Sequence, residues 1–555
     1  MSKKKDILKL ILVLLFGLFI RLILLDRIPV GINDDELHFV LNAKSFFYGQ
    51  NFSLSEMSSV VFAPIIGPLP LNLFTVKLPY AIISIFSILL LYSIVKKLTK
   101  SSNLSLLIAL VACLNPWSIY TARTSFDAPL AIFFFLLSLY LMVKAKPLPI
   151  FLSIITGFLA FNSYIGTKIL YFPFTAISSF YCWKFLSQKL SKHYLLVTLF
   201  SLLITLNFIF SLSHQTVGQR LSELWAPTSP KIAALVNDER RESLRPALSL
   251  FTNKYTIYFR ESFKKYLNNF SPNVLFLIGD SAFTGSLWIH GYFYYLDILL
   301  IIFGIIFLYH NYRYFFFLVL SFILISPIPE AIRSDSIPAY VFHSSFQYPF
   351  LFILLGSGVF YFFKIIKFKP LKIFFIFLYL LSFLNFLNIY FIKSPVYQSE
   401  SFVFSHRLVG KYLNLENQKN RETYFLTQQP ELMFRSFLFY NNLFTRQNFQ
   451  LIQKSYSQSH DSFTFGYVHF INNENLLPKE GNFTLIFDVN NFNFDDPGSS
   501  LFVSRISDAG KIFSIHHGTS CQNIQMETFV HDINFSDLKI EKLNETYFCR
   551  KFITI

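Results

Sequence analysis

Long apolar runs alternate with short polar segments over the first 390 residues, and this pattern predicts a chain that crosses a membrane many times. A helix needs roughly 20 mainly apolar residues to cross the hydrocarbon core of a bilayer. About eleven runs come near that length, at residues 7–25, 78–95, 103–119, 128–143, 148–165, 169–186, 194–212, 291–309, 314–328, 346–363 and 371–391. We therefore predict a mostly α, polytopic membrane protein with about 11 transmembrane helices.

The charges in the intervening segments predict the orientation of these helices. If the amino terminus is cytoplasmic, the inside segments carry clusters of Lys and Arg, and Asp6 is their only acid. This is the bias that cytoplasmic loops show. The net charge of +16 therefore follows from topology and does not indicate a nucleic-acid partner. We expect a protein of the cytoplasmic (inner) membrane with its amino terminus in the cytoplasm and its carboxyl terminus outside the cell membrane.

Composition supports the same class and marks a second domain. Charged residues make up 14% of the chain and the mean hydropathy is +0.46, whereas soluble domains carry about 25% charged residues. After Lys393-Ser394-Pro395 the sequence becomes rich in Asn, Gln, Ser and acids. We predict a transmembrane module over 1–395, with a first outside loop at 26–77 and a long outside loop at 213–290. An extracytoplasmic α/β domain should follow at 396–555.

The tail and the long outside loop contain recognisable local patterns. In the tail, residues 406–415 suit a helix, and segments rich in aromatic and β-branched residues predict strands at 422–427, 463–470, 483–489, 511–516 and 546–555. An amphipathic helix is expected around 255–267 of the long loop. Cys521 and Cys549 both belong to the tail and could pair in an oxidising compartment, but their spacing does not decide between a disulfide and two thiols.

The first outside loop holds the most unusual polar feature, the run Asp34-Asp35-Glu36. Only seven acids occur in the first 210 residues, and three of them are adjacent here. Neighbouring carboxylates repel one another, so they persist when they are solvated, bound to a cation, or used in proton or phosphate chemistry. A solvated loop is the simple alternative. The chain has no P-loop, no Gly-rich dinucleotide motif, no CxxC and no internal repeat.

The order of motifs around this acidic run resembles a known group of enzymes. The run Asp35-Glu36, followed by Asn42-Ala43, lies after the first apolar segment, and Lys77-Leu78-Pro79 opens the second. Asn115-Pro116-Trp117-Ser118, Ala122-Arg123 and Phe126-Asp127-Ala128-Pro129 precede the fourth. The chain resembles bacterial members of the protein O-mannosyltransferase and aminoarabinose transferase group (glycosyltransferase family 39 and its relatives). The resemblance covers about residues 5–395, and it includes 266–272, 277–280 and His290-Gly291.

The resemblance implies a C-type glycosyltransferase (GT-C) fold and an activity. Such enzymes transfer a sugar from a polyprenyl-phosphate carrier to an acceptor at the outer face of the membrane, with inversion at the anomeric carbon. Two segments differ from the pattern of the group. Residues 62–70 stand where many relatives have His-x-Pro-Pro or Lys-Pro-Pro, and 342–346 stand where relatives carry His-Ala-x-Arg or His-Arg.

The chemistry of such a transfer selects candidate residues. A carboxylate must deprotonate or orient the acceptor hydroxyl, and cations or a metal ion must stabilise the departing phosphate. The resemblance assigns the first role to Asp35 with Glu36 beside it. For substrate and phosphate binding we name the outside residues Arg123, Asp127, Arg260, Lys264, Arg333 and His343. A divalent ion, Mg or Mn, held by Asp35, Glu36 and His38 is an optional addition.

Each candidate has a plainer alternative, and so has the function. Arg123 and Asp127 could form a surface pair four residues apart, while Arg260 and Lys264 could contact lipid headgroups. The expected partners of the enzyme are a polyprenyl-phosphate sugar donor, the lipid bilayer and an extracytoplasmic protein, lipid or glycan acceptor. The alternatives are a transporter or flippase for a lipid-linked saccharide, which should show polar residues within its spans and an internal repeat, and a non-catalytic member of the family.

Overall fold

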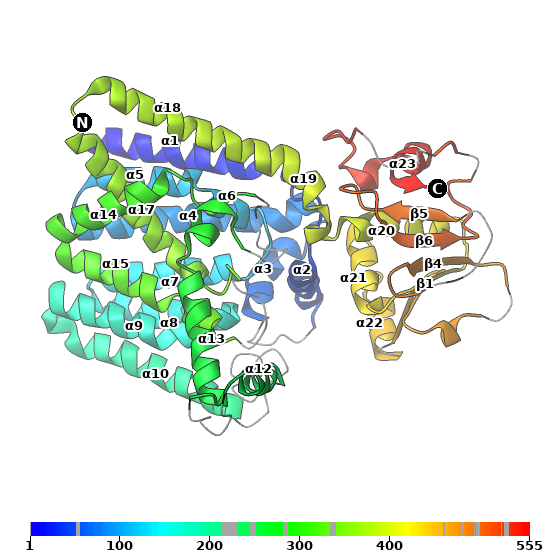
Figure 1. The fold of residues 1–555 in the computed structure, drawn as a ribbon, viewed down its shortest axis with the longest axis horizontal. Helices are drawn as coiled ribbons and strands as arrows, with labels where there is room; N and C mark the ends of the chain where they lie inside the picture. Colours follow the sequence, from blue (N-terminus) through cyan, green and yellow to red (C-terminus); the bar gives the residue numbers. More distant parts are fainter. Residues whose placement is uncertain are drawn as a thin grey trace. The chain divides into compact units, whose positions relative to one another are not determined.

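The computed structural model describes most of the chain as helices, with a small sheet near the carboxyl end (Figure 1). It describes residues 2–50, 56–213, 230–244, 251–280, 287, 289–333, 340–458, 461–478, 481–492, 494, 500–522, 524–526 and 532–555. Two compact units result: a helical unit of 1–21, 81–122 and 127–387, and a second unit of 22–80, 123–126 and 388–555. The second unit therefore combines the tail with the first outside loop, which the division at residue 395 had separated.

The helical unit contains a helix at each of the predicted apolar runs. Its helices lie side by side, with α14 against α17, α7 against α8, and α9 against α10 (Figure 1). The bounds are α1 Ser2–Leu22, α4 Leu73–Thr99, α5 Ser102–Leu114, α6 Pro116–Thr121, α7 Ala128–Val143, α8 Pro147–Ser163, α9 Ile165–Phe185, α10 Ser191–Ser213, α14 Asp297–Asn311, α15 Arg313–Ile325, α16 Ile328–Ala331, α17 Tyr348–Ile365 and α18 Lys369–Asn388.

The number of membrane spans is smaller by the criterion of length and composition. Among the described residues, five helices are long and apolar enough to cross a bilayer: Leu73–Thr99, Gln188–Ser211, Arg313–Ala331, Ser345–Ile365 and Lys369–Tyr397. Others, such as α5 and α7, are apolar but shorter than 18 residues. The prediction of helices at the eleven apolar runs is confirmed, whereas their identity as eleven spans stays a prediction.

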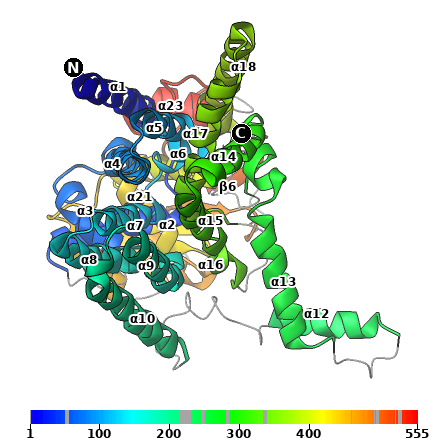
Figure 2. The same ribbon diagram turned by 90° about the vertical axis from the view of Figure 1, so that its left-hand side faces the viewer.

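The long outside loop contains the expected amphipathic helix. It is α13, Lys254–Asn268, which begins after the N-cap Asn253. A second helix, α12 (Pro230–Arg241), packs against it, and Ile232, Val236 and Ile257 form their shared core. Figure 2 shows this pair outside the group formed by the other helices of the unit. The remaining parts of 213–290 lie partly outside the described residues.

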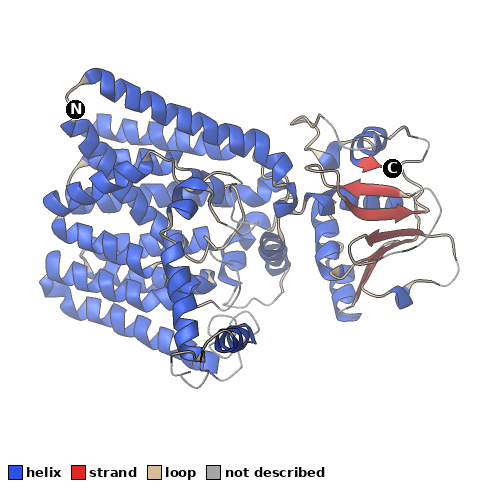
Figure 3. Ribbon diagram, viewed as in Figure 1, coloured by secondary structure: helices blue, strands red, loops and turns tan. Residues whose placement is uncertain are grey.

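The second unit contains the described strands of the protein, which form one mixed sheet (Figure 3). The sheet order is β2-β3-β1-β4-β6-β5-β7, and β1 runs parallel to both β3 and β4. The strands are β1 Thr423–Leu426, β2 Ser462–Phe465, β3 Val468–Ile471, β4 Thr484–Asp488, β5 Leu501–Ser504, β6 Lys511–His516 and β7 Ile553–Thr554. The helices are α2 Asp34–Phe47, α3 Met57–Ile66, α19 Ser394–Tyr397, α20 Phe404–Gln418, α21 Pro430–Tyr440, α22 Phe449–Gln458 and α23 Glu545–Phe552.

Alternation along the strands explains how the sheet is covered. Successive side chains of a strand point to opposite faces, so Phe425 of β1 faces the same side as its neighbour Phe470 of β3. Phe470 packs against Phe434 and Phe437 of α21. On the other face, Leu426 forms a buried cluster with Ile471, Leu485 and Phe487. The sheet is therefore packed on both faces.

The tail confirms most of the predicted elements and corrects two. The helix predicted at 406–415 is α20, and the strands at 422–427, 483–489 and 511–516 are β1, β4 and β6. The segment 463–470 is not one strand but the hairpin of β2 and β3, because Gly466 has a φ of +61° and turns the chain. The segment 546–555 is mainly the helix α23, since Asn544 caps it and Phe548 and Phe552 bury one helical face.

Candidate functional site

The acidic run of the first outside loop forms the first turn of α2. Asn33 caps this helix: its Oδ1 accepts a hydrogen bond from the Glu36 amide at 2.9 Å, and the Asn33 amide donates to Glu36 Oε2 at 3.2 Å. This reciprocal pair is a capping box. The positive end of the helix dipole also favours carboxylates in a first turn. The three acids are therefore adjacent because they begin a helix, which the loop prediction did not foresee.

Glu36 is the buried member of the three acids. Its side chain is fully buried, and besides the Asn33 amide it accepts a hydrogen bond from the Ser125 amide. Burial raises the pKa of Glu36 above its ordinary value, although the nearby Lys77 ammonium and the two amide donors act in the opposite direction. Glu36 thus joins the α2 turn to the segment 123–126. Both of its oxygens serve this structural purpose.

Three buried cations hold the backbone of residues 28–31, shortly before the acidic turn. Lys77 donates from Nζ to the carbonyls of Pro29 at 3.1 Å and Gly31 at 2.9 Å. Arg123 donates to the Ile28 carbonyl at 2.9 Å, and Arg407 donates to the Val30 carbonyl at 2.6 Å. Every carbonyl from 28 to 31 therefore accepts a hydrogen bond from a cation. This arrangement fixes the backbone that leads into Asp34, Asp35 and Glu36.

The tail supplies part of this support. Arg407 lies on α20, is 2% exposed, and forms a bidentate ion pair with Glu541 at 2.6 and 2.7 Å. Tyr440, at the end of α21, accepts a hydrogen bond from the Ile32 amide at 3.1 Å. The guanidinium of Arg123 lies over the rings of Tyr390 and Phe391. Residues on both sides of the predicted boundary at 395 therefore hold the first loop.

The exposure of the acids separates their possible roles. Glu36 is buried, Asp34 is exposed, and Asp35 is partly exposed. Asp35 thus combines access to solvent with a backbone that is fixed on its amino-terminal side.

His38 lies one helical turn beyond the acids. Its Nε2 is 3.0 Å from Asn42 Nδ2 and 3.7 Å from Glu56 Oε1, and its Nδ1 is 3.4 Å from Arg435. In the part of the chain that the structure describes, no group of three or more His, Cys, Asp or Glu could hold a metal ion. Because both Glu36 oxygens accept amide hydrogen bonds, Asp35, Glu36 and His38 do not fit the proposed metal, and we derive no step through one.

The helical unit contains a second polar cluster, around Arg333 and His343. Glu330 is fully buried and lies 3.1 Å from His343 Nδ1 through Oε2, while its Oε1 accepts the Tyr340 amide at 3.1 Å. Arg333 Nη1 is 3.2 Å from His343 Nδ1 and 3.7 Å from Glu330. The two residues named for phosphate binding are therefore neighbours. The sequence prediction missed Glu330, although it precedes Arg333 by three residues, a helical spacing.

The other predicted phosphate contacts have local partners. Arg260 pairs with Glu239 of α12 and with Glu261, and Lys264 pairs with Glu261 at 2.8 Å. Asp127 is the N-cap residue of α7, whereas Arg123 precedes it in a non-helical turn. These two residues are thus not a pair on one helix. The next residue of α13, Lys265, donates to the Arg333 carbonyl at 2.7 Å.

Comparisons with known proteins give one kind of match. No protein-family model and no curated protein sequence matches the chain. Among solved structures, it is similar to ArnT from Cupriavidus metallidurans bound to undecaprenyl phosphate, with 11% identity and a TM-score of 0.48 over 91% of this chain and 97% of that chain. The apo state of ArnT gives 10% identity and a TM-score of 0.38 over the same shares. At this level of likeness, no residue's role is carried over.

Proposed function

We propose that the protein is a membrane glycosyltransferase. It transfers a sugar from a polyprenyl-phosphate carrier to a protein, lipid or glycan acceptor at the outer face of the cytoplasmic membrane. One observation carries the proposal: Asp35 is partly exposed on a turn whose backbone is fixed by Lys77, Arg123 and Arg407. A fixed carboxylate at a defined position is what general-base catalysis needs.

In this mechanism, Asp35 accepts the proton of the acceptor hydroxyl. The hydroxyl oxygen then forms a bond to the anomeric carbon of the sugar, on the side opposite to the carrier. The bond between that carbon and the phosphate oxygen breaks, so the configuration inverts and the polyprenyl phosphate leaves with the electron pair. Glu36 does not take the proton in this scheme, because its oxygens hold the Asn33 and Ser125 amides. It keeps the turn in place.

The departing phosphate needs positive charge, for which Arg333 and His343 are our candidates. Their close spacing supports a shared contact with one phosphate, although Glu330 offsets part of their positive charge. Arg260 and Lys264 are weaker candidates, because their side chains are exposed and water screens their charges. The prenyl chain would lie among the apolar helices, where each buried CH2 contributes about 0.8 kcal/mol.

The tail supports the proposed orientation. Cys521 and Cys549 form a disulfide, and disulfides persist mainly in oxidising compartments outside the cytoplasm. A tail outside the membrane agrees with the charge bias of the predicted loops. The acidic turn, which shares a compact unit with the tail, would then face the same compartment.

The test measures release of the polyprenyl phosphate by purified protein in liposomes, with a panel of polyprenyl-phosphate sugars and membrane extract as the acceptor source. Asp35→Asn should reduce release by at least about 100-fold, the usual contribution of a general base. Its thermal unfolding midpoint should be unchanged. Glu474→Gln, at an exposed acid in the tail, is the control and should keep most of the activity. Unchanged release by Asp35→Asn would contradict the assigned base, and movement of intact lipid-linked sugar across the bilayer without release would favour the transporter.

A further inference from the structure

Two adjoining hollows lie in the unit that contains the tail. Their volumes are about 420 and 340 Å³, and both are lined by Glu431 and Arg435 of α21. Pockets for small ligands usually measure roughly 300–1,000 Å³. The two side chains form an ion pair at 2.5 Å, so they stand at the junction of the hollows. We call the combined space the α21 groove.

The larger hollow runs along one face of α2. His38, Asn42 and Ser45 line it, and their spacing of four and three residues places them on one side of that helix. Gln453 and Tyr456 of α22 also line it. Two aromatic rings, those of Phe444 and Phe449, also line this hollow, and their centroids are 5.9 Å apart. The hollow thus offers hydroxyl and amide groups together with flat apolar surfaces.

The smaller hollow lies where two parallel strands end. Gln428 and Gln429 follow the carboxyl end of β1, Asn472 follows that of β3, and all three line the hollow. The two strands are neighbours in the sheet. Ligands of open α/β sheets bind outside the carboxyl ends of parallel strands. The position of this hollow therefore indicates binding independently of its volume.

The charges around the groove restrict the kind of ligand. Asp34, Glu431 and Asp461 bring three carboxylates, whereas Arg435 brings one guanidinium. A phosphate or a uronic acid would meet net repulsion there. A ligand with many hydroxyls and no negative charge could use the amides and hydroxyls for hydrogen bonds and pack its C–H faces against the rings.

We propose that the α21 groove binds a neutral saccharide chain. We further propose that this saccharide is the glycan acceptor, and that part of the proposal rests on the proposed glycosyltransferase activity. Asp34 lines the end of the groove and is the chain neighbour of Asp35. A saccharide in the groove therefore reaches the turn that carries the proposed base.

The test measures direct binding, without donor, to the full-length protein in phosphatidylcholine nanodiscs, because sugar-headed detergents would compete. The probes are the neutral trisaccharides mannotriose, galactotriose and chitotriose, with trigalacturonate as the anionic counterpart of galactotriose. Saturation-transfer NMR detects binding and titration gives Kd. At least one neutral trisaccharide should bind, and trigalacturonate should not.

Variants locate the binding. Gln453→Trp, at an exposed position of the groove wall, should abolish binding, whereas Lys454→Trp on the next residue of α22 should not. Arg435→Gln should weaken binding by about tenfold, the loss of one charged hydrogen bond. Arg505→Gln, in an exposed ion pair elsewhere in the tail, is its control.

The outcomes separate this inference from the proposed function. Absence of binding by every neutral probe, or binding that Gln453→Trp leaves intact, would overturn the groove. Preferential binding of trigalacturonate would overturn the charge argument. Asp35→Asn should keep saccharide binding while it loses transfer. If Asp35→Asn keeps both, the groove stands and the assigned base fails; if Gln453→Trp loses binding and keeps transfer, the groove does not hold the acceptor.

Discussion

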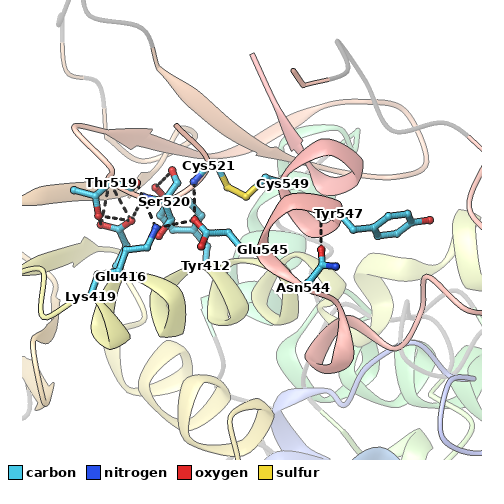
Figure 4. Close-up of a disulfide and its surroundings, with 10 residues drawn as sticks. All are labelled: Tyr412, Glu416, Lys419, Thr519, Ser520, Cys521, Asn544, Glu545, Tyr547 and Cys549. Atoms are coloured by element: carbon cyan, nitrogen blue, oxygen red, sulfur yellow. Dashed lines mark hydrogen bonds and ion pairs between the residues drawn. A yellow bond between two sulfur atoms is a disulfide. The ribbon is translucent and has the colours of Figure 1, made fainter. Parts of the chain in front are cut away.

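Two buried glutamates, Glu36 in the first loop and Glu416 in the tail, have different surroundings. Glu36 begins α2 and receives the Asn33 and Ser125 amides. Glu416, near the end of α20, receives the Ser520 amide at 2.5 Å, the Thr519 amide at 3.0 Å and the Thr484 hydroxyl at 2.8 Å (Figure 4 draws Glu416 with Thr519 and Ser520). Both residues are 0% exposed.

The pKa values of the two carboxyl groups shift in opposite directions, because the balance between burial and hydrogen bonding differs. Burial alone would raise the pKa of Glu416, but hydrogen bonds from Ser520, Thr484 and Thr519 hold that pKa below its ordinary value. For Glu36, burial wins and the pKa is raised. A buried carboxylate is thus stabilised when hydrogen-bond donors replace its lost water. The surroundings of Glu416 favour its charged form, whereas those of Glu36 disfavour the charged form.

Loss of the disulfide should lower the stability of the tail more than any other change below. Cys521 directly follows Thr519 and Ser520, whose amides donate hydrogen bonds to Glu416. The bond joins residues 28 apart in the chain, for which loop-closure entropy predicts about 3–4 kcal/mol. The double variant Cys521→Ser, Cys549→Ser should lower the free energy of unfolding of the tail by that amount. Thermal unfolding of the full-length protein measures it. Dithiothreitol should destabilise the wild type but not the variant, and equal sensitivity of both would contradict the prediction.

Arg407→Gln should weaken the contacts that hold the first loop. It leaves Glu541 without its guanidinium and the Val30 carbonyl without a charged donor. Breaking a buried ion pair costs about 3–5 kcal/mol. Because Glu541 is partly exposed, we expect the free energy of unfolding to fall by about 3 kcal/mol. Sugar transfer should fall as well, because Val30 lies just before the acidic turn. Arg407→Lys should recover part of both losses, and transfer unaffected by Arg407→Gln would refute the supporting role of the tail.

Glu416→Gln should cost about 1.5–3 kcal/mol at neutral pH, the value of a hydrogen bond to a charged group. The folded-state pKa lies below the ordinary 4.5, so the stabilisation is present above that value and disappears as the pH falls through the lowered pKa. The deficit of the variant should therefore shrink in acid. Unfolding curves at pH 4, 6 and 8 test this, with the exposed Glu474→Gln as the control. A deficit that does not change with pH would contradict the charged form of Glu416.

Glu36→Gln should have the smallest effect and the opposite pH trend. Because the folded-state pKa is raised, Glu36 contributes stability below its ordinary 4.5 and loses it as the pH rises through the raised value. The difference between variant and wild type should therefore be largest in acid and become smaller towards pH 8. The same unfolding curves measure it. A deficit that grows with pH would show that Glu36 is held as an anion, like Glu416.

The pattern of apolar residues predicted most of the helices. The pattern of polar residues predicted much less of the candidate site. Every apolar run became a helix, because burial of such a run depends on its own composition. The acidic turn had a readable signal, the Asn33…Glu36 spacing of a capping box, which identifies a helix start. The residue pattern of α23 also had one, since Asn544 precedes an amphipathic segment. Reading 546–555 as a strand from its aromatic content overlooked that cap.

The partners of the acidic turn could not be predicted from the sequence. Lys77 opens an apolar run, Ser125 lies between two helices, and Arg407 and Tyr440 belong to a tail more than 360 residues away along the chain. No local spacing connects such residues. They meet only because the second unit brings together three separate segments.

The sequence by itself thus determined the apolar helices, the mixed α/β tail and the presence of an unusual acidic run, because each depends on neighbouring residues. Tertiary structure decided which of the three acids is buried, which cations hold the backbone before them, and which polar side chains line the α21 groove. These features depend on hydrogen bonds and desolvation between distant segments, and neither exists until the chain has folded.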